Sequence, residues 1–237
     1  MTPAKVRRKK AAPDAAEVVA WLKRKGSKKG RDGMARYGLP SDNAFGVAIG
    51  VMQRYAKDIG RSHDLAIALW ETGWYEARTV AAFVDEPERV TPAQMDQWCR
   101  DFDSWGICDT VCFHLFDRSP HAWSKVKKWS SSREEFVKRG AFALLACLAL
   151  HDKAAEDAKF IASLPLIERA ATDDRNFVKK GVSWALRLIG RRNLALNAET
   201  VALSRRLAAS SAPSARWIGS GAVKELTSAA VVKRLRR

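Results

Sequence analysis

The sequence predicts an all-α protein, built as a right-handed solenoid of antiparallel helix pairs. Three observations predict this class. Apolar residues recur with the period of an α-helix along most of the 237-residue chain. No segment bounded by turn residues alternates cleanly between apolar and polar side chains, as a strand would. A short sequence motif also recurs 41 residues after its first occurrence, which is the spacing of a repeated helix pair.

The first elements are a basic arm and one helix. Residues 1–13 combine Lys, Arg and Ala with two prolines, a composition that predicts a disordered arm. Residues 14–25 place Val18, Val19 and Leu22 on one helical face, and Gly26 ends this helix. Residues 26–31 are predicted as a loop. We expect residues 14–237 to form one domain, since nothing in the composition requires a second.

After this loop the helical pattern becomes regular. Ser41, Thr91 and Ser119 mark helix starts as N-cap residues, and Asp173 with Asp174 marks another. Helical segments are predicted at 43–57, 62–72, 74–85, 91–103, 105–117, 119–129, 132–151, 159–171, 173–191, 196–209 and 212–229.

The recurring motif narrows the architecture. The segment 136–141, Phe-Val-Lys-Arg-Gly-Ala, returns at 177–182 as Phe-Val-Lys-Lys-Gly-Val, and acidic residues precede both copies. This period is typical of HEAT-like repeats, in which the second helix of each pair lines the concave side. One basic residue per repeat there would create a concave basic groove. The alternative is that two similar hexapeptides arose by chance.

The charge indicates a polyanionic partner. The chain has 42 Lys and Arg against 26 Asp and Glu, a net charge of +16, and residues 1–36 alone carry twelve basic side chains against three acidic ones. No window is apolar enough to span a membrane, and the basic N-terminus lacks the apolar region of a secretion signal, so we expect a cytoplasmic, nucleoid-associated protein without membrane contact. The four cysteines lack metal-ligand spacing and are predicted as reduced core residues. We therefore expect no metal and no cofactor.

Three places combine aromatic and charged residues at helical spacing. Trp105 and Asp109 are four residues apart, so they share a helix face, although an indole in the core with a surface carboxylate would give the same pattern. Arg139 follows Lys138 and could simply be solvated. The third place is a stripe that carries a tryptophan among cations, which suits a surface that meets bases and phosphates. Its residues are Lys180, Trp184, Arg187 and Arg191, with Lys179 beside them.

This ordered set resembles the DNA alkylation repair glycosylases with HEAT-like repeats. The resemblance covers about residues 35–230 and rests on Tyr-Glu-Ala-Arg at 75–78, on Trp105 with Asp109, on Arg139 and on Trp184. It implies that Trp105, Trp184 and Asp109 line the catalytic cleft and that Arg139 binds the DNA backbone nearby. Lys138, Lys179, Lys180, Arg187 and Arg191 are the remaining DNA-binding candidates.

The resemblance also implies an activity. A cationic N3- or N7-alkylated purine leaves without protonation, so an ionised Asp109 need only stabilise the sugar cation and activate water. We expect a monomeric, monofunctional enzyme on double-stranded DNA that leaves an abasic site and keeps the base stacked. Two alternatives remain open: a non-catalytic relative that binds damaged or branched DNA in the same groove, and a solenoid scaffold for an acidic protein.

Overall fold

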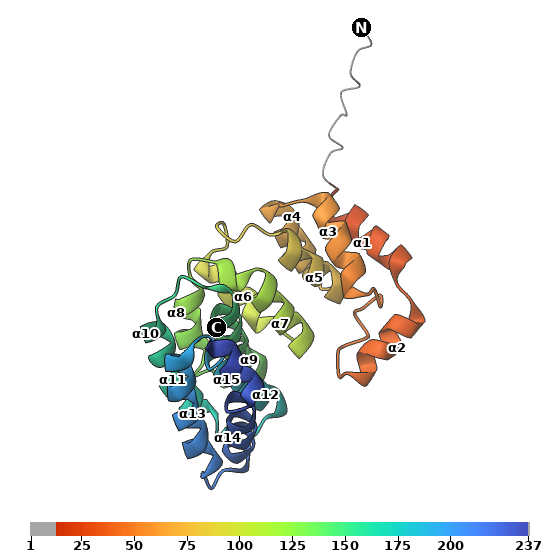
Figure 1. Ribbon diagram of the computed structural model, residues 1–237. Helices are drawn as coiled ribbons and strands as arrows, with labels where there is room; N and C mark the ends of the chain where they lie inside the picture. Colours follow the sequence, from red (N-terminus) through yellow and green to blue (C-terminus); the bar gives the residue numbers. More distant parts are fainter. Residues whose placement is uncertain (1–12, 237) are drawn as a thin grey trace. The chain divides into compact units, whose positions relative to one another are not determined.

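The computed structural model describes residues 13–236, and every regular element in that range is a helix, which confirms the all-α class (Figure 1). The chain divides into two compact units, Met1–Asp85 and Glu86–Arg237, and the single domain over residues 14–237 stays a prediction. Apart from residue 13, the predicted basic arm lies outside the described residues. Within the described range no helix is long and apolar enough to cross a membrane. The right-handed course and the concave groove stay predictions.

The first unit is built around the faces that periodicity predicted. Val18 and Leu22 on the first helix are fully buried, as are Leu69 and Val80 on later helices, and Trp21 stacks on Tyr55 with ring centroids 3.7 Å apart. Its helices are α1 (Ala15–Lys25), α2 (Lys28–Arg36), α3 (Ile49–Ile59), α4 (His63–Glu71) and α5 (Tyr75–Val84).

The predicted loop at 26–31 is wrong, because α2 begins at Lys28. Ser27 is its N-cap, and its hydroxyl accepts a hydrogen bond from the Gly30 backbone N–H at 3.0 Å. The loop was predicted because Gly30 is a helix-breaking residue type. It stands in the helix because the Gly46 carbonyl oxygen would lie 2.1 Å from a Cβ at this position, so only glycine permits the contact.

Glu76 ties the segment before α3 to α5. Its carboxylate is fully buried and accepts backbone N–H hydrogen bonds from Phe45 (2.9 Å), Gly46 (2.7 Å) and Val47 (3.2 Å). In the same motif Arg78 packs over the Trp70 ring, with its guanidinium carbon 5.0 Å from the centroid. The Tyr-Glu-Ala-Arg motif thus organises the first unit.

The second unit contains the paired helices of the predicted repeats. The pairs are α8 with α9, α11 with α12 and α13 with α14, and the second helices of the pairs, α9, α12 and α14, pack on one another in succession. The helices are α6 (Pro92–Arg100), α7 (Trp105–His114), α8 (Ala122–Trp129), α9 (Glu135–His151), α10 (Asp157–Ile161), α11 (Leu164–Ala170), α12 (Asn176–Ile189), α13 (Leu194–Ala208), α14 (Pro213–Leu226) and α15 (Ala229–Leu235), with a 3-10 turn, η1 (Phe116–Arg118), after α7.

The repeated hexapeptide occupies the same place in two of these pairs. Phe136 and Phe177 stand in the first turns of α9 and α12, and their rings lie 5.3 Å apart. The glycine of each copy faces a residue that precedes it in the chain and belongs to another helix. A Cβ on Gly140 would lie 3.1 Å from Cys99 Sγ, and one on Gly181 would lie 3.5 Å from Arg139 Cγ. The repeat in sequence is therefore a repeat in packing.

One predicted helix is divided in the structure, and one helix lies beyond the predicted segments. The segment 159–171 splits into α10 and α11, where Pro165 stands in the first turn of α11. The segment 212–229 corresponds to α14, and α15, which Ser228 caps through its hydroxyl, was not predicted. All four cysteines are buried and unpaired, as predicted.

Candidate functional site

Every predicted site residue lies in the second unit, and the site begins at the N-terminus of α7. Trp105 and Asp109 are both half-buried on one face of this helix, as their spacing predicted. The other face packs on α9, where Cys108 Sγ lies 3.9 Å from the Phe136 carbonyl oxygen and Cys112 Sγ lies 3.7 Å from that of Gly140. Cys108 and Cys112 thus hold α7 against α9, while the Asp109 carboxylate remains partly exposed to solvent.

Arg139 on α9 forms a bidentate ion pair with Asp109. Its Nε donates to Asp109 Oδ1 at 3.0 Å, its Nη2 donates to Oδ2 at 2.7 Å, and its Nη1 donates to the Phe177 carbonyl oxygen at 2.7 Å. The arginine is 6% exposed, whereas the Asp109 side chain is 23% exposed. In this structure the donors of Arg139 point at Asp109 and α12, and its contact with the DNA backbone stays a prediction.

Two opposing effects set the proton affinity of Asp109. Burial raises the pKa of this carboxyl, while the charge and hydrogen bonds of Arg139 lower it, and the net direction is above the ordinary aspartate value. The guanidinium occupies one lone pair on each oxygen. Because a carboxylate oxygen offers two, Asp109 keeps acceptor capacity toward the solvent side.

Lys138 is engaged in a second ion-pair network. Its Nζ lies 2.9 Å from Asp173 Oδ2, and Arg175 donates to both oxygens of the same carboxylate at 2.9 Å and 2.6 Å. Hydrogen bonds from these cations hold the pKa of Asp173 well below its usual range. The acidic flank of the second hexapeptide therefore links the starts of α9 and α12. In this structure Lys138 forms the ion pair on the α9 side of this link.

Trp184 enters the site on α12. It is half-buried and lies one turn after Gly181, the residue at which α12 faces Arg139. Because α12 packs along α9, and α9 along α7, these three adjacent helices carry Asp109, Arg139 and Trp184. Lys180, one turn before Trp184, is exposed.

The rest of the cationic stripe on α12 is partly neutralised by α14. Glu225 accepts hydrogen bonds from Arg187 Nη1 at 2.8 Å and from Arg191 Nη1 at 3.4 Å. The sequence analysis missed this carboxylate. Glu225 lies 38 and 34 residues after the two arginines, which is close to the repeat period. This separation was the signal in the sequence that the carboxylate lies in the next helix pair.

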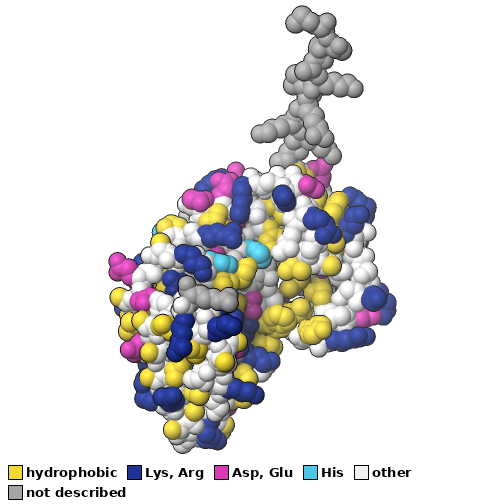
Figure 2. All heavy atoms as spheres, viewed as in Figure 1, with side chains coloured by type: hydrophobic (Ala, Val, Ile, Leu, Met, Phe, Trp, Pro, Cys, Tyr) yellow, Lys and Arg dark blue, Asp and Glu magenta, His cyan; other side chains and the backbone are white. Residues whose placement is uncertain are grey.

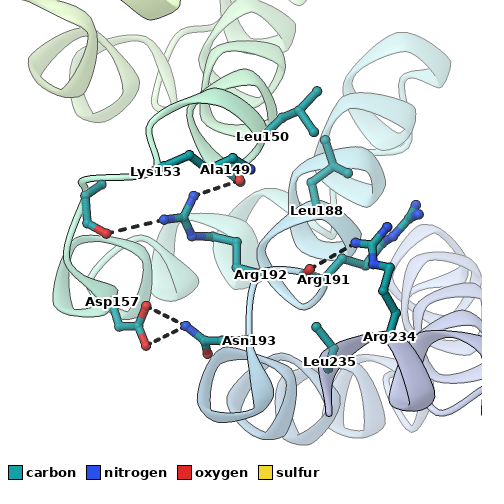
Figure 3. A pocket seen from close by; sticks show the side chains of 11 residues that line it. Ala149, Leu150, Lys153, Asp157, Leu188, Arg191, Arg192, Asn193, Arg234 and Leu235 are labelled. Carbon is teal, nitrogen blue, oxygen red and sulfur yellow. Dashed lines mark hydrogen bonds between the residues drawn. The ribbon is translucent and has the colours of Figure 1, made fainter. Parts of the chain in front are cut away.

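Arg191 also borders a cationic cavity of about 680 Å³ at the ends of α9, α12 and α15 (Figure 3). Its carbonyl oxygen accepts from Arg234 Nη2 at 3.1 Å, and Arg192 donates to the Ala149 and Ala155 carbonyl oxygens at 2.8 Å and 3.3 Å. Figure 3 shows these arginines turned toward the ends of the helices. Arg192 thus caps a carbonyl group in the last turn of α9, and the other two acceptors lie between α9 and α10 and just beyond α12.

Trp217 is an aromatic residue that the sequence analysis did not select. It lies on α14, is 50% exposed, and carries the Lys179 ammonium group over its ring at 5.1 Å from the centroid. Lys179, predicted to bind DNA, therefore forms a cation–π contact at the surface. On the face drawn in Figure 2, Lys and Arg side chains clearly outnumber Asp and Glu. Among residues 13–236, no three His, Cys, Asp or Glu side chains cluster as metal ligands would.

Comparisons with known proteins concern the family and the fold of the chain. The family described as DNA alkylation repair enzyme matches residues 18–216. No curated relative matches the chain. A solved structure described as "a new family of proteins related to the HEAT-like repeat DNA glycosylases with affinity for branched DNA structures" is similar at a TM-score of 0.73 and 21% identity, over 81% of this chain and 83% of that one. The likeness confirms the HEAT-like fold, and the chain belongs to the DNA alkylation repair enzyme family.

Proposed function

We propose that this protein is a monofunctional DNA glycosylase that removes cationic N3- or N7-alkylated purines from double-stranded DNA. The observation that carries the proposal is the placement of Asp109. Its carboxylate is half-buried, stands one turn from a half-buried indole, and is held by a buried guanidinium. A carboxylate held in a fixed position within a sparingly solvated site suits the stabilisation of a developing sugar cation.

The reaction needs little acid catalysis. An alkylated purine already carries a positive charge, so the C1′–N bond breaks with its electron pair moving to the base, which leaves neutral. Asp109 stabilises the resulting charge on the sugar and accepts a proton from the water whose oxygen bonds to C1′. Trp105 and Trp184 would flank the sugar through cation–π contact. With water as the nucleophile, the product is an abasic site in an intact strand.

The proposed DNA surface continues along α12. Lys180 is exposed, and Arg187 retains 36% exposure although it binds Glu225. These cations are suited to phosphate contacts, which give sequence-independent and salt-dependent affinity. We propose that the protein acts as a monomer, since Trp105, Asp109, Arg139 and Trp184 all come from one chain.

The second candidate is a non-catalytic DNA-binding protein. The observation that favours it is that Arg139 donates to both oxygens of Asp109, which leaves fewer acceptor sites for a catalytic water. The structural neighbour is described by its affinity for branched DNA, which is consistent with binding as the main role of such a fold.

The experiment that separates the two measures release of radiolabelled methylpurines from methylated duplex DNA, with DNA binding measured alongside. Wild type should release the purines and leave strands that break only after alkali treatment. Asp109→Asn should retain binding and lose release. Asp103→Asn is the matched control, because Asp103 is exposed on the segment just before α7 and its replacement removes the same charge. Binding without release by the wild type would establish the second candidate instead.

A further inference from the structure

A small hollow lies beside the exposed ring of Trp217, on the surface formed by α12 and α14. Its volume is about 420 Å³, and its lining residues are Ser183, Arg187, Trp217, Ser220, Gly221 and Lys224. The lining thus combines one aromatic wall, a floor of small residues and two cations, without a carboxylate. Four of these residues lie beyond residue 216, where the family match ends.

The aromatic wall is the one tryptophan of residues 13–236 that is exposed, since the other tryptophans there are buried or half-buried. Trp217 is 50% exposed, whereas Trp70, Trp98 and Trp129 are at most 3% exposed. Leaving half of an indole in water forgoes the stabilisation that burial of its apolar surface would give. Lys179 positions the ring from α12 by its cation–π contact. An exposed aromatic ring fixed between helices is suited to stacking on a flat ligand.

The cations around the ring suit an anionic partner. Arg187 is fixed at the floor, because its Nε donates to the Ser183 carbonyl oxygen at 3.1 Å and its Nη1 to Glu225 at 2.8 Å. Lys224 is exposed on one side of the hollow and Lys179 lies over the ring. Gly221 adds no side chain, and nothing lies within 4 Å of where its Cβ would be, so the floor is open.

We propose that this hollow binds one unpaired nucleotide of DNA, with its base stacked on Trp217 and its phosphate held by Lys179 and Lys224. The volume suits one nucleotide and is far below what a duplex occupies. Stacking on an indole also requires a free base face, and bases inside a duplex are covered by their neighbours. The site rests on the proposed DNA-binding function and adds a preference for forked or gapped DNA. Arg187 belongs both to this hollow and to the stripe that contains Trp184.

The test compares two DNA ligands, a fully paired duplex and a fork that exposes one unpaired strand. Dissociation constants are measured for the wild type, Trp217→Ala, Trp217→Phe and Leu194→Ala, the last being a control because Leu194 on α13 is also 50% exposed. A base stacked on an aromatic ring contributes about 1–3 kcal/mol, so Trp217→Ala should weaken fork binding by roughly 5- to 150-fold. Duplex binding should change less than about twofold, since phosphate contacts dominate it. Trp217→Phe should keep most of the fork preference.

A second readout detects stacking directly. A fork with 2-aminopurine as its unpaired base should lose fluorescence on binding the wild type and keep it on binding Trp217→Ala. Equal loss of duplex and fork binding in Trp217→Ala, or unchanged fork binding, would overturn the proposal. If the wild type binds duplex and releases methylpurines but binds the fork no more tightly than the duplex, only this inference fails. If the wild type binds neither DNA, the proposed function fails together with it.

Discussion

Replacement of Arg139 by alanine should destabilise the second unit strongly. The change removes two hydrogen bonds of 3.0 Å and 2.7 Å to Asp109 and a third of 2.7 Å to the Phe177 carbonyl oxygen. Arg139 is 6% exposed, so the carboxylate would stay in a poorly solvated place without its counter-charge. Removing one partner of such a pair costs about 3–5 kcal/mol. An exposed ion pair would contribute no more than about 1 kcal/mol.

The assay is urea denaturation followed by tryptophan fluorescence, with the free energy of unfolding extrapolated to water. Asp109→Asn, Arg139→Gln and the double variant complete a thermodynamic cycle. The double variant should cost less than the two single changes together, because two neutral amides can hydrogen-bond to each other in the same place. A loss below about 1 kcal/mol for Arg139→Ala would refute the reasoning and would return Arg139 to the predicted role of a DNA contact.

Three further predictions concern charge. Burial alone would raise the pKa of Asp96, but hydrogen bonds from Lys125, Lys128 and Trp129 lower it to about 2, so Asp96→Asn should lose about 2 kcal/mol at pH 7. This stabilisation is complete above the unfolded pKa near 3.8 and is lost as the pH falls toward 2. Denaturation at pH 7 and pH 3 should therefore show a smaller loss of unfolding free energy for Asp96→Asn at pH 3, and an equal loss at both pH values would contradict this. Glu225→Gln should raise the affinity for duplex DNA a few-fold and steepen its salt dependence, because it frees two arginines. Dissociation constants that equal those of the wild type at two salt concentrations would argue against this. Because the pKa of Asp109 is raised, base release should fall on acidification at a higher pH than an ordinary aspartate would give, and a pH–rate profile flat down to pH 4 would oppose this.

The sequence predicted the elements whose signal is local. Helical periodicity located most helices, and the 41-residue offset located the equivalent turns of α9 and α12. Helix α2 escaped prediction because Gly30 is there for a contact with Gly46, a residue in another segment. The division at Pro165 did carry a local signal, since proline is favoured in the first turn of a helix.

The same division between local and tertiary information applies to the site. The spacing of Trp105 and Asp109 placed both on one face of α7, because four residues make about one helical turn. The partner of Arg139 could not be predicted, since Asp109 is 30 residues away and only packing brings them together. Glu225 and Trp217 were missed for the same reason, as each gains its role from α12.

The most direct test of the account is a single-turnover measurement on a duplex that contains one N7-methylguanine, with enzyme in saturating excess. The rate constant for base release is compared between the wild type, Asp109→Asn and the control Asp103→Asn. A general base contributes about 10²- to 10⁴-fold, so Asp109→Asn should fall by at least 100-fold while the control stays within about twofold. An Asp109→Asn rate equal to that of the wild type, with folding and DNA binding intact, would contradict the central claim.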